Sequence, residues 1–195
     1  MARIATIPPE DFHERLSARL GHPTSQNRVA LGSMVGWARR PEVALAFLEL
    51  QDALRRSTSL RPRLLELVRL RVAFHNQCRS CMAVRSSAAV EDGLDDVAVC
   101  SLQRPHEAPD LSEAERAALT YADALATDHF SIDDGVFATL RQHFSEDEIV
   151  ELGAHVGVCV GFGRVAMSWD LVDDLPVELR AEGVVDPWSV TPAER

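Results

Sequence analysis

Apolar residues recur at helical spacing, about every 3.6 positions, along most of the chain, and no run alternates as a half-buried strand does. This periodicity limits the fold more than any other feature, because helices and strands place their apolar faces at different spacings. It predicts an all-α chain. The predicted helices cover residues 9–20, 26–39, 41–56, a segment starting near 62, a segment through Cys78 and Cys81 that ends at Gly93, and residues 112–127, 133–143 and 145–170.

A single domain accommodates these segments, since 195 residues is an ordinary domain length. We expect one compact bundle of about eight helices over residues 1–195, with a Pro-rich, acidic and irregular tail at 176–195. Two capping boxes support the later helix starts. Ser112 is followed by Glu115, and Ser145 by Glu148, at the spacing where side chain and backbone exchange hydrogen bonds.

The charge balance argues against nucleic-acid binding. The chain has 20 Lys and Arg residues against 30 Asp and Glu residues, a formal net charge of -10, and such a chain repels phosphate backbones unless it carries a basic patch. No apolar run reaches the roughly twenty residues that span a bilayer, and residues 1–10 lack the apolar segment of a signal peptide. We therefore expect a cytoplasmic protein that binds neither nucleic acid nor membranes.

Two of the four cysteines, Cys78 and Cys81, form a C-x-x-C pair, whereas Cys100 and Cys159 stand alone. On a helix, residues three apart share a face and are close enough to form a disulfide. If Cys78 occupies the first helical turn, the free N–H groups there favour its thiolate, the nucleophile of peroxide reduction and disulfide exchange. The second cysteine then resolves a sulfenic acid or mixed disulfide. The pair therefore predicts redox chemistry.

Other interpretations of the cysteines stay open. A zinc site normally uses four nitrogen or sulfur ligands, and His75 with the pair supplies three, with Cys100 as an uncertain fourth. The paired cysteines can also be inert core residues, because free cysteine is often buried. His155 and Cys159, spaced i, i+4 in the last apolar segment, are interpreted as core residues rather than as a second site. The redox interpretation without a metal is favoured.

The segment from Glu66 to Cys81, ELVRLRVAFHNQCRSC, resembles the core motif of the carboxymuconolactone decarboxylase family, in its alkyl hydroperoxidase D-like branch. The family pattern places a glutamate twelve residues before the first cysteine and an asparagine two residues before it. Glu66 and Asn76 match these positions, together with both cysteines of the pair. A glutamate and a C-x-x-C pair at this spacing form a fairly specific signature.

The second half of the chain is also similar to this family. Residues 119–122 and 144–152 resemble its later helices, and Arg164 falls where an arginine is common. The resemblance covers residues 40–172 and implies a compact helical bundle of the alkyl hydroperoxidase D-like type. It further implies that no organic cofactor is bound and that the protein forms homo-oligomers.

Two positions depart from the family pattern. The histidine expected four residues after the second cysteine is Arg85, and Ser80 stands where the branch's hydroperoxidase has a histidine. In that branch the glutamate and histidine relay protons to the thiols, which arginine cannot do because it stays charged. Arg85 is instead expected to stabilise a thiolate, since Cys78, Cys81 and Arg85 are spaced i, i+3 and i+7 on one predicted helix face.

Glu66 and His75 are the candidate proton acceptors. Glu66 lies among apolar residues, and partial burial would suit it to accept a proton. A surface ion pair with Arg69 or Arg63 is the alternative. His75 lies one helical turn before the pair and could replace the missing base, although a capping or solvated histidine is the more common case.

These observations favour a thiol-dependent peroxidase or disulfide oxidoreductase in which Cys78 and Cys81 cycle between dithiol and disulfide. Glu66 would accept the proton and Arg85 would hold the thiolate. The expected partners are a small-molecule peroxide or disulfide and a thiol protein as reductant. Two alternatives remain: an enzyme of the same fold that decarboxylates or otherwise converts a small organic acid or lactone, and a non-catalytic redox-sensing interaction protein.

Overall fold

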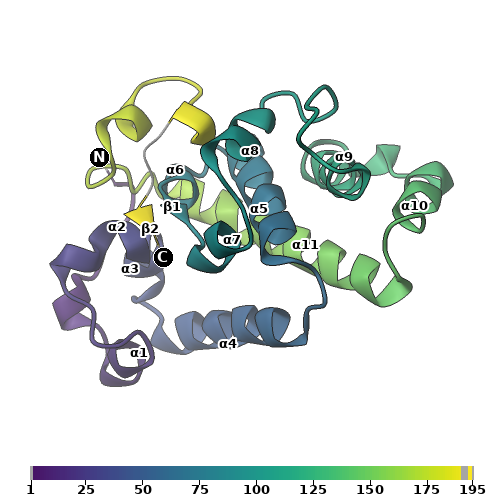
Figure 1. Cartoon of the computed structure of the whole chain (residues 1–195). Coiled ribbons are helices and arrows are strands. Elements are labelled where there is room, and N and C mark those ends of the chain that lie inside the picture. The colour runs from purple at the N-terminus through teal and green to yellow at the C-terminus, as the bar shows by residue number, and fades with distance from the viewer. Residues whose placement is uncertain (1, 190–192, 195) are drawn as a thin grey trace.

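The computed structural model describes residues 2–189 and 193–194, and within them it confirms the all-α prediction (Figure 1). The α-helices of the described residues are α1 (Glu14–Arg19), α2 (Arg28–Leu31), α3 (Met34–Trp37), α4 (Pro41–Ser57), α5 (Pro62–Asn76), α6 (Arg79–Met82), α7 (Ser87–Glu91), α8 (Asp96–Ser101), α9 (Glu113–Thr127), α10 (Asp134–Leu140) and α11 (Glu146–Ser168). Short 3-10 helices and two-residue strands connect them: η1 (Pro9–Asp11), η2 (Ser25–Asn27), η3 (His129–Ser131), η4 (Val177–Arg180), η5 (Pro187–Ser189), β1 (Val84–Arg85) and β2 (Ala193–Glu194).

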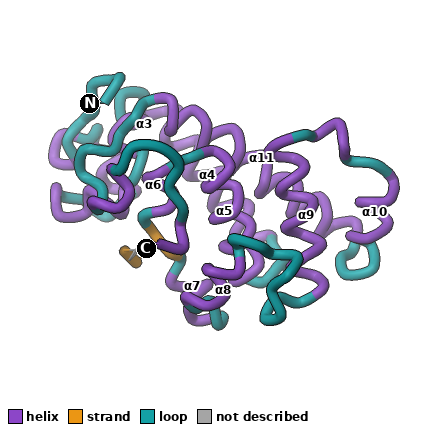
Figure 2. The backbone as a smooth tube through the Cα atoms, turned by 90° about the horizontal axis from the view of Figure 1, so that it is seen from above, coloured by secondary structure: helices purple, strands orange, loops and turns teal. Residues whose placement is uncertain are grey.

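Three long helices, α5, α9 and α11, form the centre of the molecule. Figures 1 and 2 both show α5 lying against α11, with α9 packed beside them. Their facing side chains are fully buried, and Leu67, Val68, Leu119 and Leu152 have no exposed area. Burial of apolar area contributes about 25 cal/mol per Å² to folding, so this cluster holds the bundle together. It also fixes the end of α5, where the cysteine pair begins.

A second apolar cluster joins the N-terminal helices to the end of α11. Leu16 of α1 and Val35 of α3 are buried there, and Leu171, just beyond α11, packs among them. The rings of Phe47 and Phe162 stack with centroids 4.0 Å apart and connect α4 to α11. The N-terminal third of the chain is therefore part of the same bundle and lies along one side of it (Figure 1).

The long helices and both capping boxes agree with the sequence predictions. Helices α4, α5, α9, α10 and α11 occupy the expected segments. Ser112 Oγ accepts from the Glu115 N–H while the Glu115 carboxylate accepts from the Ser112 N–H. Ser145 and Glu148 make the same exchange at the start of α11. These segments are long enough for periodicity and caps to define them.

The prediction of a continuous helix through the cysteine pair to Gly93 is wrong. Gln77 ends α5 in the left-handed conformation (φ 51°), which breaks the helical path. The pair then lies on the single turn α6, followed by β1 and the short α7. Gly93 does end this segment, with φ 86° as a C′ glycine prefers. The predicted helix over 26–39 is likewise interrupted at Gly32, whose φ is 54°.

The tail at 176–195 is more ordered than expected within its described residues. It contains η4 and η5, and β2 pairs in parallel with β1, with Val84 opposite Ala193 and Arg85 opposite Glu194. Residues 190–192 and 195 lie outside the described residues. Helix α8, in a stretch where we expected a loop, begins with Asp95, whose side chain accepts from the Ala98 N–H. The tail thus returns to the segment that carries the cysteine pair.

Helix α11 is long and apolar enough, by length and composition alone, to cross a membrane, with a mean hydropathy of 1.4 over an 18-residue window. The search for continuous apolar runs in the sequence missed this window. In the structure α11 packs against α5, α9 and α4. Its polar side chains make internal contacts: Glu151 accepts from Thr58, and Arg164 donates to Asn76.

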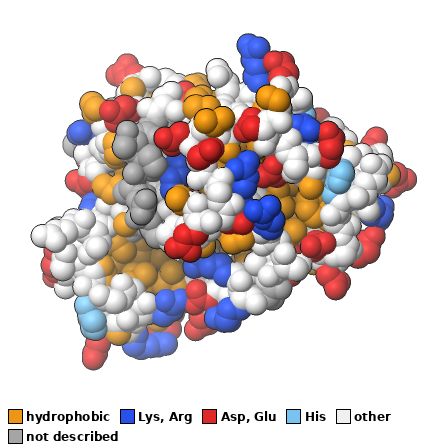
Figure 3. Space-filling model, viewed as in Figure 1, with side chains coloured by type: hydrophobic (Ala, Val, Ile, Leu, Met, Phe, Trp, Pro, Cys, Tyr) orange, Lys and Arg blue, Asp and Glu red, His pale blue; other side chains and the backbone are white. Residues whose placement is uncertain are grey.

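Charged side chains of both signs share the visible surface. On the face shown in Figure 3, acidic and basic groups are interspersed, with apolar areas between them. Ion pairs between side chains at the surface of the protein include Arg15–Glu42 and Arg61–Asp92.

Candidate functional site

Cys78 and Cys81 form a disulfide at the end of α5, with their Cα atoms 5.2 Å apart. The left-handed Gln77 redirects the chain, so that Cys78 becomes the N-cap residue of α6. The backbone N–H groups of Cys81 and Met82 both donate to the Cys78 carbonyl, at 2.9 and 3.1 Å. The expectation that Cys78 stands at the start of a helix is confirmed, although that helix is a single turn. The spacing of the pair therefore allows an S–S bond across one helical turn.

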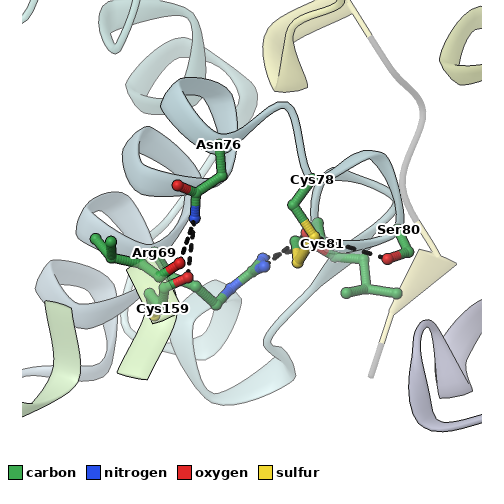
Figure 4. Close-up of a disulfide and its surroundings, with 8 residues drawn as sticks. Arg69, Asn76, Cys78, Ser80, Cys81 and Cys159 are labelled. Atoms are coloured by element: carbon green, nitrogen blue, oxygen red, sulfur yellow. Dashed lines mark hydrogen bonds between the residues drawn. A yellow bond between two sulfur atoms is a disulfide. The ribbon is translucent and has the colours of Figure 1, made fainter. Parts of the chain in front are cut away.

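The two sulfur-bearing residues differ in accessibility. Cys78 is only 1% exposed, whereas Cys81 is half-buried. The Cys78 Sγ lies 3.7 Å from the hydroxyl oxygen of Ser80, within hydrogen-bonding reach for sulfur (Figure 4). A hydroxyl at this distance can donate to a thiolate and favour the charged form. Ser80, at the position of a histidine in the resembling branch, is thus a neutral donor to the pair.

Glu66 and Arg69 form a buried ion pair directly beneath α6. The Arg69 Nε and Nη2 atoms lie 2.7 Å from the two carboxylate oxygens of Glu66, which is only 4% exposed. Arg69 also donates to the carbonyls of Cys81 (2.6 Å) and Val84 (2.9 Å). Figure 4 shows the guanidinium reaching from α5 towards the disulfide. Burial opposes the charge of Arg69, but the ion pair with Glu66 outweighs it and raises the guanidinium pKa.

The structure combines the two sequence interpretations of Glu66. The side chain is buried, as expected for a proton acceptor, and it also pairs with Arg69, as in the alternative, though not at the surface. The Ser86 N–H donates to the same carboxylate at 3.0 Å. Both oxygens of Glu66 thus already accept hydrogen bonds from N–H groups. Arg69 links this carboxylate to the backbone of Cys81.

The assumption that Arg85 shares a helix face with the cysteines is wrong. Helix α6 ends at Met82, and Arg85 lies in β1. Its side chain is buried and donates to the carbonyls of Met82 (2.9 Å), Val84 (3.1 Å) and Pro187 (2.5 Å). Burial, and then the nearby charge of Arg69, lower the pKa of Arg85 to about 10. Arg85 thus binds backbone carbonyls, and Arg69 is the guanidinium that contacts Cys81.

His75 points towards α9. Its Nε2 lies 2.7 Å from the carboxylate of Asp123, which also accepts two hydrogen bonds from Arg71. Burial raises the pKa of Asp123, but the hydrogen bonds from His75 and Arg71 outweigh it, so the pKa is lowered. His75 therefore pairs with Asp123 of α9 and not with a sulfur atom.

Asn76, the other residue that matches the family motif, ties α5 to α11. Its amide nitrogen donates to the Cys159 carbonyl at 2.9 Å (Figure 4), and its amide oxygen accepts from Arg164 Nε at 3.1 Å. The approach to α11 is close: a Cβ atom at Gly163 would lie 2.6 Å from the Asn76 amide. Asn76 therefore positions the end of α5 and does not contribute a reacting group.

His155 and Cys159 of α11 pack against the core, as expected, and also pair with each other. The Cys159 Sγ lies 3.9 Å from the His155 Nε2, which is 2.9 Å from the Leu65 carbonyl. Because a carbonyl only accepts, this nitrogen must carry a hydrogen and cannot take the thiol proton. Burial raises the Cys159 thiol pKa, but His155 and Arg69 outweigh it and lower that pKa. His155 and Arg69 thus both favour the charged form of Cys159.

This pairing predicts how Cys159 reacts. In His155→Asn the imidazole that lowers the Cys159 pKa is lost, so that pKa should rise and alkylation near pH 7 should slow by up to about tenfold per pKa unit. Iodoacetamide labelling of the oxidised protein across pH, read peptide by peptide in a mass spectrometer, measures this. Cys100, which is free and exposed on α8, is the internal control. Identical Cys159 profiles in both proteins would show that His155 does not stabilise the thiolate.

Within the described part of the chain, no group of three or more His, Cys, Asp or Glu side chains is arranged to hold a metal ion. Cys100 lies on α8, exposed to solvent, and His75 binds Asp123. The cysteine pair is closed as a disulfide, so these residues do not come together as zinc ligands in this structure. The site consists of the disulfide, Ser80 and the Glu66–Arg69 pair.

Comparison with known proteins supports the resemblance of this all-helical bundle to the alkyl hydroperoxidase D-like fold. Residues 41–124 match the model of the carboxymuconolactone decarboxylase family. The fold resembles the alkylhydroperoxidase AhpD core of an uncharacterized peroxidase-related protein from Ralstonia eutropha, with a TM-score of 0.74 and 18% identity over 91% of this chain and 94% of that one. Both matches support the resemblance to the carboxymuconolactone decarboxylase family that the motif of residues 66–81 indicated.

Two further similarities support this resemblance. Protein ATU0492 of Agrobacterium tumefaciens, of unknown function, has a TM-score of 0.61 and 29% identity over 72% of this chain and 94% of that one. The uncharacterized protein Rv2313c of Mycobacterium tuberculosis is 34% identical over 121 residues. That match covers 60% of this chain and 42% of the relative, so the chain spans less than half of that protein's length.

Proposed function

We propose that this protein is a thiol-dependent peroxidase or disulfide oxidoreductase that cycles Cys78 and Cys81 between dithiol and disulfide. The observation that carries the proposal is the disulfide itself, closed across one helical turn beside Ser80 and the Glu66–Arg69 pair. Vicinal thiols with a hydrogen-bond donor and a nearby cation are the arrangement that activates a thiolate and resolves its oxidation product.

The proposed reaction with a hydroperoxide runs in two steps. One thiolate attacks the terminal peroxide oxygen, the O–O bond breaks, and the alkoxide leaves as an alcohol after taking a proton. The resulting sulfenic acid is then attacked by the second thiol, which forms the S–S bond and releases water. A dithiol reductant supplies two electrons and two protons to restore the pair.

Arg69 takes the electrostatic role in this mechanism that the sequence suggested for Arg85. Its guanidinium donates to the Cys81 carbonyl, which places a positive charge beside the cysteine segment. Glu66 is proposed as the proton acceptor because it is the carboxylate of the site, while Arg69 stays charged and only holds that carboxylate in place. Accepting a proton requires Glu66 to give up one of its hydrogen bonds. A cytoplasmic location, a homo-oligomeric assembly and a thiol protein as reductant belong to the same proposal.

Conversion of a small organic acid or lactone is the second candidate. It is favoured by the name of the family whose model matches residues 41–124 and by the arginine in place of the relay histidine. Such chemistry does not need the S–S bond. The two candidates therefore differ in their dependence on the thiols.

A short peroxide pulse on the reduced protein tests the proposal. We expect peroxide to be consumed in proportion to protein, with the loss of two hydrogens from the peptide that contains Cys78 and Cys81. Mass spectrometry after alkylation of the remaining thiols follows both changes. If the folded dithiol protein survives the pulse without forming this disulfide, the proposed function is wrong.

A further inference from the structure

Residues 172–189, here called the C-terminal strap, fold back over the segment that carries the cysteine pair. Figure 1 shows this yellow-green part of the chain running from η4, beside α6, to η5, beside α8. It follows α11 and is far from the pair in sequence. The strap is the part of the tail that was expected to be irregular.

Polar side chains on both sides of Cys78 hold the strap by its backbone. Arg79, between the two cysteines, donates to three strap carbonyls at 2.6 to 3.1 Å. Gln77, just before the pair, donates to the Val185 carbonyl at 3.1 Å and accepts from its N–H at 2.9 Å. Arg85 donates to the Pro187 carbonyl. All six bonds come from residues 77–85.

Apolar contacts close the same interface. Leu175, Leu179 and Val185 of the strap are buried against the α6 segment, where Met82 has no exposed area. Cys81 itself packs in this cluster. The strap therefore borders the half-buried Cys81, so a protein dithiol needs more room beside the strap than a small molecule does.

Helix α6 connects the disulfide to the strap, because it contains both Cys81 and Arg79. The S–S bond joins Cys78 to Cys81 around Arg79, the residue with the most bonds to the strap. Helix α6 has four residues, and so short a helix has little stability of its own. Breaking the S–S bond removes the covalent cross-link between the two ends of this short segment. The position of the Arg79 side chain then becomes less defined, and the strap loses its main anchor.

We propose that the C-terminal strap is a redox-coupled cover: it docks on the disulfide form, limits access of protein dithiols to the pair, and loosens on reduction. The reduction breaks the S–S bond with two electrons and two protons from a dithiol, which itself becomes a disulfide. By thermodynamic linkage, release of the strap must in turn favour reduction. This inference rests on the thiol–disulfide chemistry proposed above.

Trypsin cleavage of the unmodified protein is the first test. Arg180 is the only Lys or Arg in the strap and is exposed within η4. We expect cleavage after Arg180 to be at least about fivefold faster in the dithiol form than in the disulfide form, the lower end of ordinary coupling between two sites. Arg141, exposed at the end of α10, is the internal control. Equal ratios of the two cleavage rates in both forms would overturn the proposal.

The second test uses Arg79→Met, which removes three bonds to the strap and keeps the cysteines. Reduction of the disulfide by thioredoxin, a protein dithiol, should become several-fold faster, while reduction by dithiothreitol should change less. Arg180→Met is the matched control, because among the described residues Arg180 donates to a carbonyl of the strap itself, that of Asp173. An unchanged thioredoxin rate in folded Arg79→Met would contradict the cover.

Failure of the inference and failure of the proposed function give different results. If the protein reduces no peroxide but its disulfide is reduced at strap-dependent rates, the cover stands and the peroxidase does not. If peroxide turnover occurs and cleavage after Arg180 is independent of redox state, the proposed function stands and the cover is wrong. The trypsin test needs no variant, so it also decides the matter if Arg79→Met does not fold.

Discussion

Replacing both Cys78 and Cys81 with serine is expected to reduce peroxide consumption by about a thousandfold or more, the usual consequence of removing a catalytic nucleophile. A serine hydroxyl stays protonated at neutral pH and cannot form an S–S bond, so both steps of the cycle are lost. Peroxide decay with the fully reduced protein and a dithiol reductant measures the effect. Because Cys78 is buried, circular dichroism should show that the double variant is folded.

Cys100→Ser is the matched control, since it removes an exposed thiol outside the site and should leave the rate unchanged. The single variants separate the roles of the pair: the one that keeps the attacking thiol should form a sulfenic acid with one equivalent of peroxide and then stop. If the double variant retains turnover of a small organic acid or lactone, the enzyme is a decarboxylase-like protein. Retained peroxide turnover would rule out a mechanism based on this pair.

The long helices were predictable because each carries several turns of apolar periodicity. Helices α5, α9 and α11 bury residues such as Leu70, Leu119 and Leu152 at helical spacing, and capping boxes mark two of their starts. The short elements around the cysteine pair have no such signal. Gln77 adopts a left-handed conformation although it is not glycine, and nothing in its sequence context indicates this break.

The candidate site was likewise predictable in part. The motif identified the cysteines and Glu66, which the structure places around α6. The role given to Arg85 depended on a helix that continued past Ala83, and it failed with that helix. The pairing of Arg69 with Glu66 was one of the sequence alternatives, at the i, i+3 spacing of a helical ion pair, but it was expected at the surface and without a contact to Cys81. The bond from His75 to Asp123 joins residues 48 apart, which periodicity does not reveal.

The contacts of the C-terminal strap were not predictable, for a different reason. Arg79 and Gln77 bind backbone carbonyls and an N–H of the tail, and backbone groups are the same at every residue. No complementary side chain in the tail marks where it docks. Sequence patterns therefore indicate which residues can be buried, but they do not indicate which backbone carbonyls an arginine side chain will contact.

The Glu66–Arg69 pair should be the most sensitive point of the fold. In Arg69→Met the Glu66 carboxylate, only 4% exposed, would lose its bidentate partner, and breaking a buried pair in this way costs about 3–5 kcal/mol. For a chain of this length, that corresponds to a fall in Tm of about 10 °C. Urea unfolding followed by circular dichroism, with the disulfide intact, gives the free energy of unfolding.

Arg85→Met is the matched comparison. Arg85 is buried to a similar degree and donates to backbone carbonyls of the same loop, but its bonds are to Met82, Val84 and Pro187 rather than to Glu66. Since burial already lowers its pKa to about 10, the loss of its charge removes a desolvated cation, and the cost should be smaller than for Arg69. The double variant Glu66→Gln with Arg69→Met should recover part of the stability, because no uncompensated carboxylate remains. If Arg69→Met and Arg85→Met destabilise the protein equally, the ion pair contributes no more than the carbonyl bonds, and Arg69 has no special electrostatic role beside the cysteines.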